Sequence, residues 1–185
     1  HWTEFPTAPG GGPGAAIGGR DKAEATDEFI ETAAAEGLDI KKQMVVRPQS
    51  LIFSFRGRVH PFISTPTFKQ IQEPPRETWA EQLSQPSVRS LILGEVEELM
   101  SEDSLVGRIA RQSWAPDSDR WKRLYPITEG FDYEPAPELS VQRICKDSNE
   151  PILDFVYDHL LTKEATGTIW EGGYSDVSRF YNHAH

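Results

Sequence analysis

The chain has 185 residues, and its 19 Lys and Arg against 29 Asp and Glu give a formal net charge of −10 and a pI near 5.0. This length suits one domain with a buried core, and the negative charge argues against nonspecific binding to duplex nucleic acid, which needs Lys and Arg to displace counterions. No apolar run approaches the roughly 20 residues of a membrane span, so we expect a soluble chain.

Residues 1–20 are predicted to form an extended arm, because they are rich in Gly and Pro and carry no periodic apolar pattern. Trp2 and Phe5 are the side chains by which such an arm would bind a partner, since extended segments dock through aromatic plugs and main-chain hydrogen bonds. The chain begins with His1. A processed precursor is therefore one expectation and a piece of a longer chain is another, and the compartment stays open.

The next elements are predicted to be one helix and then several strands. Ala25, Phe29 and Ala33 follow helical spacing and Gly37 is a typical C-terminal stop, which predicts a helix over 22–36. The β-branched and aromatic runs 44–46, 51–55 and 59–63 predict strands of a small antiparallel sheet. Prolines at three positions predict a loop over 64–76.

Short helices are predicted to dominate the rest of the chain. Val88, Ile92 and Val96 follow helical spacing after Pro86. A further helix is predicted to start at a Ser101 cap and to run to Trp114, with Leu105, Ile109 and Ser113 at helical spacing. Residues 115–138 are predicted to be irregular, a helix is predicted from Pro151 to Leu161, and a short last helix over 174–182.

These elements predict an α+β fold, with mostly short helices packed beside a small antiparallel sheet and an extended Gly/Pro-rich N-terminal arm. The predicted organisation is an arm over 1–20 and a single domain over 21–185, which has Pro-rich loops and an aromatic C-terminal tail. Trp170 and Tyr174 make that tail a candidate for docking, because tails that carry aromatic side chains usually pack on something.

A basic and aromatic stretch is the strongest candidate for a binding surface. The segment 108–123 interleaves basic side chains with tryptophans, which is typical of the residues that dominate the energy of protein interfaces. The candidate partner-binding residues there are Arg108, Arg111, Trp114, Trp121 and Arg123. A solvated helix end followed by a loop with a core tryptophan is the other interpretation of the same stretch.

Two alternatives belong to other functional classes. Asp154 and Asp158 are four residues apart on one helix face, and with His159 and His60 they could form a metal-assisted hydrolase site; the outer face of an amphipathic helix is the simpler interpretation. The acidic segment from Glu95 to Asp103 could instead mask the basic active site of an enzyme, as an inhibitor protein would.

No cofactor is expected from the sequence. The glycines of residues 10–14 follow no strand and precede no Lys-Ser or Lys-Thr pair, so they do not make a nucleotide-binding loop. The single cysteine, Cys145, excludes an intramolecular disulfide and is expected to be a buried apolar side chain.

The sequence therefore predicts a non-enzymatic structural or interaction subunit of a larger protein complex. It identifies no small-molecule substrate and no catalytic or metal-binding residue.

Overall fold

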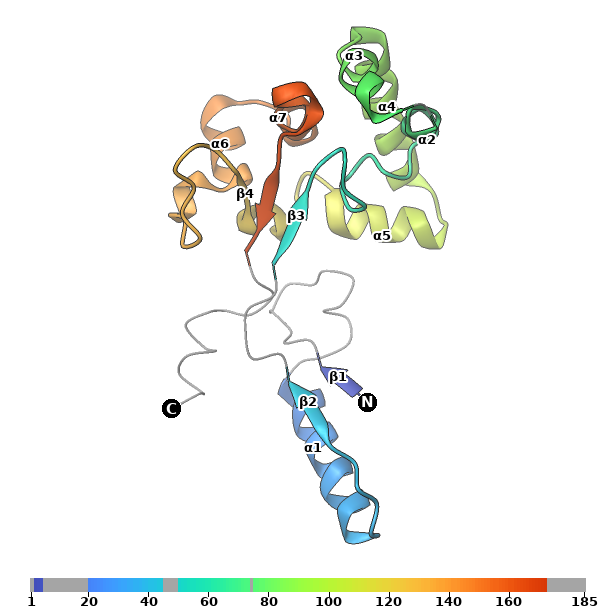
Figure 1. Ribbon diagram of the computed structural model, residues 1–185, viewed down its shortest axis with the longest axis vertical. Coiled ribbons are helices and arrows are strands. Elements are labelled where there is room, and N and C mark those ends of the chain that lie inside the picture. The colour runs from blue at the N-terminus through green and yellow to red at the C-terminus, as the bar shows by residue number, and fades with distance from the viewer. Residues whose placement is uncertain (1, 5–19, 45–49, 74, 173–185) are drawn as a thin grey trace. The chain divides into compact units, whose positions relative to one another are not determined.

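The computed structural model describes the backbone of residues 2–4, 20–44, 50–73 and 75–172, with side chains from 27–41, 50–73 and 75–172. The chain divides into two compact units, one formed by Leu51–Gly172 and the other by His1–Ser50 with Gly173–His185. The helices are α1 (Arg20–Ala35), α2 (Pro66–Gln72), α3 (Trp79–Leu83), α4 (Pro86–Ser101), α5 (Leu105–Trp114), α6 (Val141–Ser148) and α7 (Ile152–Ala165) (Figure 1).

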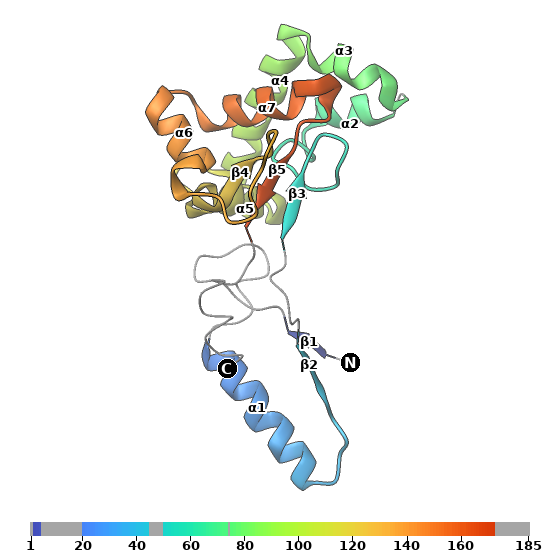
Figure 2. The same cartoon turned by 60° about the vertical axis from the view of Figure 1, so that its left-hand side comes forward.

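The strands are short and form two sheets. They are β1 (Trp2–Glu4), β2 (Lys42–Met44), β3 (Leu51–Phe53), β4 (Leu124–Pro126) and β5 (Ile169–Glu171). β1 pairs with β2 in parallel, whereas β5 lies between β3 and β4 and is antiparallel to both (Figure 2). The predicted α+β class with a small antiparallel sheet is confirmed.

In the unit of His1–Ser50 with Gly173–His185, the described residues include the helix α1. Gly37 has φ +83°, and its amide and that of Leu38 donate to the carbonyls of Ala34 and Ala33. A left-handed residue with this pair of bonds ends a helix, so the predicted stop at Gly37 is confirmed. Most of the predicted arm and the whole of the tail after residue 172 lie outside the described residues, as do the side chains of Trp2, Phe5 and Tyr174.

Residues 54–76 differ from the sequence-based prediction in two places. Residues 54–63 form turns, so the predicted strand over 59–63 is wrong, and 64–76 contains α2 where a loop was predicted. Pro66 is compatible with the first turn of a helix because that turn leaves its amides unpaired. Glu95 on α4 completes the start of α2, since its carboxylate accepts bonds from the Thr67 amide at 3.0 Å and hydroxyl at 2.6 Å.

Within 115–138, predicted to be irregular, the structure has two 3-10 turns and one strand. These are η3 (Asp119–Arg123), β4 and η4 (Pro137–Leu139); a further 3-10 turn, η2 (Arg76–Thr78), precedes α3. α7 was predicted to reach Leu161, and its regular part does end there, because Thr162 is extended and Lys163 and Glu164 have positive φ. The chain then turns back to form β5 in the centre of the sheet.

The helix pair α4 and α5 packs closely through small residues. Ile92 and Val96 of α4 are fully buried, as their spacing predicts. The predicted cap at Ser101 is wrong, because α4 continues through Ser101 and the side chain of Ser104 accepts from the Gly107 amide at 2.9 Å. The buried face of α5 is formed by Gly107, Ala110, Ser113 and Trp114. Small residues on this face let the two backbones approach.

The core contains a buried histidine surrounded by phenylalanine rings. His60 is 0% exposed, with the rings of Phe68, Phe55 and Phe62 at 4.6, 5.5 and 6.1 Å from its own. Neither ring nitrogen has a hydrogen-bond partner in the described part of the chain. Burial without a polar partner lowers the pKa of His60 from 6.5 to about 3, so the folded unit holds this ring neutral.

We predict that Gly107→Ala lowers the free energy of unfolding by about 2 kcal/mol. An added Cβ would lie 2.6 Å from the Leu99 carbonyl oxygen and 2.5 Å from that of Glu102. Gly94→Ala is the matched control, because Gly94 is on α4 with nothing within 4 Å of its Cβ position; it raises stability by about 0.5–1 kcal/mol, the helix-propensity gain. Urea unfolding measures both. Equal effects of the two substitutions would contradict the close helix contact.

We predict that His60 makes the fold sensitive to acid. The pKa of His60 in the folded chain lies below its unfolded value of 6.5. Between these two pKa values the unfolded chain binds a proton at this ring and the folded chain does not. The stability that is present above pH 6.5 is therefore lost as the pH falls toward 3. At pH 5.5 this loss is about 1.4 kcal/mol. Urea unfolding of wild type and His60→Phe at pH 7.5 and 5.5 measures this contribution, because the variant has no titratable group at position 60 and should not lose this stability. The same pH dependence in both proteins would count against it.

Candidate interaction surface

The basic and aromatic stretch 108–123 is largely part of the core. Trp114 is 7% exposed and Trp121 is fully buried, and their rings lie 5.7 Å apart. The Trp121 indole donates to the Ala115 carbonyl at 2.7 Å. A partner would reach these two rings only if the core opened, so the structure places them as packing residues and not as the exposed contacts predicted from the sequence.

Two predicted arginine contacts have structural partners instead. Arg111 donates from Nε to the Met100 carbonyl at 2.7 Å and from Nη2 to the Glu102 carbonyl at 2.9 Å, which satisfies acceptors left free at the end of α4. Arg123 has its Nη2 3.5 Å from Oε1 of the fully buried Glu171. Arg108 is exposed and has no ion pair within the described part of the chain, so of the three predicted arginine contacts it is the one that is freely presented.

The reason for this arrangement is Arg120, which the sequence analysis did not single out. Arg120 is 3% exposed and donates from Nε and Nη2 to the two carboxylate oxygens of Glu171 at 3.0 and 2.7 Å. Its guanidinium lies 4.2 Å from the Trp114 ring centroid and 5.1 Å from that of Phe53. A buried arginine needs such a bidentate carboxylate, and the rings cover its faces.

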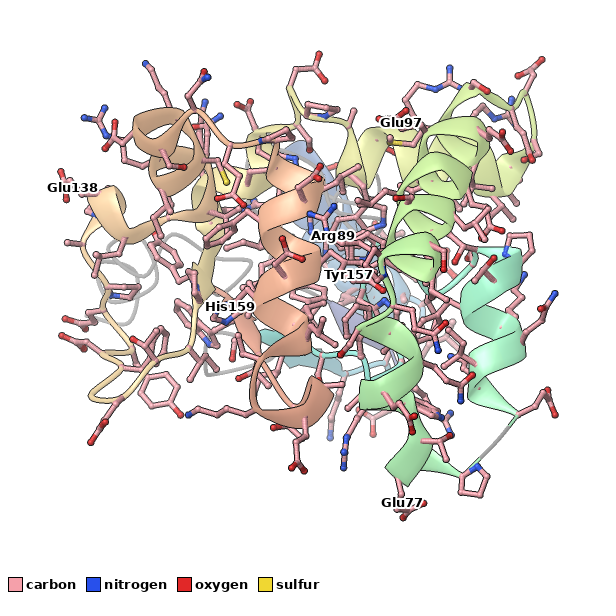
Figure 3. The ribbon with its side chains drawn as sticks, turned by 90° about the horizontal axis from the view of Figure 1, so that it is seen from above. Glu77, Arg89, Glu97, Glu138, Tyr157 and His159 are labelled. Atoms are coloured by element: carbon pink, nitrogen blue, oxygen red, sulfur yellow. The ribbon has the colours of Figure 1, made fainter. Side chains whose placement is uncertain are left out.

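The two carboxylates of the hypothetical metal site, Asp154 and Asp158, bind the side chain of Arg89. Arg89 of α4 donates from Nε and Nη2 to both oxygens of Asp158, at 2.8 and 2.9 Å, and from Nη2 to Asp154 at 2.9 Å. These bonds raise the pKa of Arg89, the bond to Asp158 most of all. Figure 3 shows Arg89 and Tyr157 between α4 and α7. The two carboxylates join these helices.

The side chains of His159, a candidate for the hydrolase site, and of Cys145 are both packed inside the unit. His159 has its Nε2 2.8 Å from the Thr168 carbonyl, and its ring stacks on Phe155; burial lowers its pKa. Cys145 is buried as predicted, and burial raises the pKa of its thiol to about 11, so it is protonated at neutral pH. Among the described residues, no group of three or more His, Cys, Asp or Glu is placed to hold a metal ion.

The acidic side chains between Glu95 and Asp103 remain on the surface apart from that of Glu95, which is partly buried and caps α2. Glu97, Glu98, Glu102 and Asp103 are exposed. These carboxylates lie at the end of α4 and in the link to α5, so they border the first turn of α5.

The outward flank of α5 carries the exposed apolar side chains that the sequence did not reveal as a surface. Leu105 is 66% exposed, Val106 49% and Ile109 42%. Leu105 and Ile109 are one turn apart, and Val106 lies beside them at a spacing of three from Ile109. We call these three side chains the α5 flank. The sequence feature that could have indicated this surface is that α5 carries the small residues Gly107 and Ser113 as well as these large apolar residues.

Comparison with known proteins gives this chain no relative. No family model, no curated protein and no solved structure matches it. Within the described residues, none of the helices combines the length and the apolar character that crossing a bilayer requires.

We predict that Glu171→Gln lowers the free energy of unfolding by about 3 kcal/mol, because it leaves the Arg120 cation buried without its counter-charge. Asp147→Asn is the matched control: it removes the carboxylate that accepts from Arg143 at 3.0 Å in an exposed pair, and such pairs contribute less than about 1 kcal/mol. Thermal and urea unfolding compare the two. If both substitutions lower the free energy of unfolding equally, the buried Arg120 does not need the charge of Glu171.

Proposed function

We propose that this chain is a non-enzymatic interaction subunit of a larger protein assembly, and that it binds another protein through the α5 flank. The observation that carries the proposal is the exposure of Leu105, Val106 and Ile109 on one side of a single helix. Contiguous apolar side chains rimmed by charge are typical of protein-binding surfaces. Arg108, Glu102 and Asp103 supply the charged rim.

The packing of α5 supports a rigid surface. Its inner face is closed by the close contact of Gly107 with the end of α4 and by Trp114, which packs edge-on against Phe53 at 5.7 Å. The helix therefore keeps one orientation, and binding at the flank needs no ordering of the backbone, although the exposed side chains still lose rotamer freedom. Complete burial of a fully exposed Leu, Val or Ile side chain contributes about 1.5–3 kcal/mol. Because these three side chains are 66%, 49% and 42% exposed, roughly half of that contribution remains to be gained when a partner covers them.

The charges of the described residues support a binding role over a catalytic one. Asp154 and Asp158 are held by Arg89, and Glu171 is held by Arg120 and Arg123. His60 is enclosed by phenylalanines, away from any polar partner in the described part of the chain. The groups considered for hydrolysis are thus held by ion pairs or enclosed in the core, whereas the apolar side chains of the α5 flank remain exposed.

The test replaces two residues of the flank, as Leu105→Glu together with Ile109→Glu. Both side chains are exposed, so the fold should be retained, and circular dichroism and the melting temperature check this. Leu91→Glu is the matched control, because Leu91 is 56% exposed on α4. Native purification of tagged protein with quantitative mass spectrometry should show at least a tenfold loss of a defined partner with the double variant and not with the control.

The proposal is contradicted if the same proteins are recovered with wild type, double variant and control. It is equally contradicted if the partner is lost with Leu91→Glu to the same extent, since the loss would then not belong to the α5 flank.

A further inference from the structure

The α5 flank has opposite charges near its two ends. Asp103 lies in the link just before the helix, and Arg108 lies on the helix one turn after Leu105 and next to Ile109. Both charged side chains are exposed, and neither has an ion pair within the described part of the chain. The exposed carboxylate of Glu102 adds to the negative end, where it accepts from the Ser104 hydroxyl at 3.0 Å. The apolar side chains of the flank therefore lie along a surface that is negative at its start and positive further on.

This order of charges is complementary to itself when a second α5 runs in the opposite direction. Reversal brings Asp103 of one copy within reach of the long Arg108 side chain of the other, and a two-fold axis makes this contact twice. Reversal also brings Leu105 against Ile109 of the other copy, because these two residues are one turn apart on the same side of the helix. A parallel pair would place like charges opposite each other, which is unfavourable.

The length of α5 limits how strongly two copies could associate. Its 10 residues make a helix about 15 Å long, at 1.5 Å per residue, and Figure 1 shows α5 at the edge of the unit Leu51–Gly172, beside α4. Two helices of this length bury a small interface, and small interfaces associate weakly and reversibly. We therefore expect a dissociation constant between about 1 and 100 µM.

We propose that the α5 flank binds a second copy of this chain, with the two α5 helices antiparallel about a two-fold axis. The inference rests on the proposed function, because it names the partner of the same surface. The centre of the contact is formed by Leu105, Val106 and Ile109 of both copies, and Asp103 and Arg108 form its rim. An apolar centre inside a charged rim is the usual arrangement of a protein interface.

The first test is sedimentation velocity of the purified full chain from about 1 to 500 µM, a range that spans the expected dissociation constant. Wild type should change from monomer to dimer over this range. Leu105→Glu with Ile109→Glu should stay monomeric, because it places carboxylates at the centre of the contact. A wild-type chain that is monomeric at every concentration would overturn the proposal, as would a dimer that this variant leaves unchanged.

Charge reversal then tests the antiparallel arrangement. Arg108→Glu puts two negative groups together in both rim contacts, and Asp103→Arg puts two positive groups together, so each variant alone should dimerise at least about tenfold more weakly than wild type. An equimolar mixture of the two variants should form mixed dimers within about threefold of the wild-type affinity, because both contacts of the mixed pair again join opposite charges. Failure of the mixture to associate more tightly than either variant alone would overturn the antiparallel pair.

Lys146→Glu is the matched control for Arg108→Glu. It makes the same change of net charge at an exposed residue of α6, and it should dimerise within about twofold of wild type, since it lies outside the flank. Melting temperatures check that all variants remain folded. An equal loss of affinity with Lys146→Glu would assign the effect to net charge and would overturn the proposed contact.

The outcomes separate this inference from the proposed function. A monomeric chain from which native purification still recovers a different protein through the α5 flank rejects only the second copy as partner. A dimer that depends on the flank, with recovery of all other proteins unchanged by Leu105→Glu and Ile109→Glu, supports the second copy and rejects the assignment of the flank to a larger assembly.

Discussion

The buried Arg120 is the residue on which the unit Leu51–Gly172 depends. Its two bonds reach Glu171 at the end of β5, and its planar group lies over Trp114 of α5 and Phe53 of β3. An isolated buried charge is prohibitive, and a bidentate pair between aromatic faces is among the few arrangements that a core tolerates. The Arg120 side chain thereby contacts strands β3 and β5 and the end of α5, and it connects them to η3, which contains Arg120.

This constraint decides what α5 presents to solvent. Because Trp114 must cover the guanidinium, the last turn of α5 is fixed against the sheet, and the close contact at Gly107 fixes its first turn against α4. The helix cannot then rotate to bury its larger side chains. Leu105, Val106 and Ile109 are left outside by the packing of their own helix, and this is the physical origin of the surface to which we assign binding.

Local signals in the sequence were sufficient for most helices. The apolar spacing before Val96, the stop at Gly37 and the expected burial of Cys145 all correspond to the structure. Non-local partners were not accessible in this way. β3 pairs with β5 from the far end of the unit, and α2 starts at a proline that Glu95 of another helix helps to cap. A proline-rich segment therefore looks like a loop when its distant partner is unknown.

The candidate site shows the same limit more sharply. Arginines interleaved with tryptophans are typical of an interface, but pairing of Arg120 with Glu171 draws Trp114 and Trp121 into the core. Of the predicted contacts in that stretch, Arg108 remains exposed without an ion pair in the described part of the chain. The surface next to it depends on which face of α5 is buried, and that is decided by the small residues Gly107 and Ser113. Their role becomes visible only with α4 in place.

The most direct measurement is site-specific photo-crosslinking in the native source, with a photoreactive amino acid placed at position 109 and, separately, at position 91. Ile109 is on the α5 flank and Leu91 is an exposed apolar residue of α4. The account predicts a discrete crosslinked partner from position 109 and none from position 91. A chain that stays uncrosslinked at position 109, or that yields the same products at both positions, would contradict it.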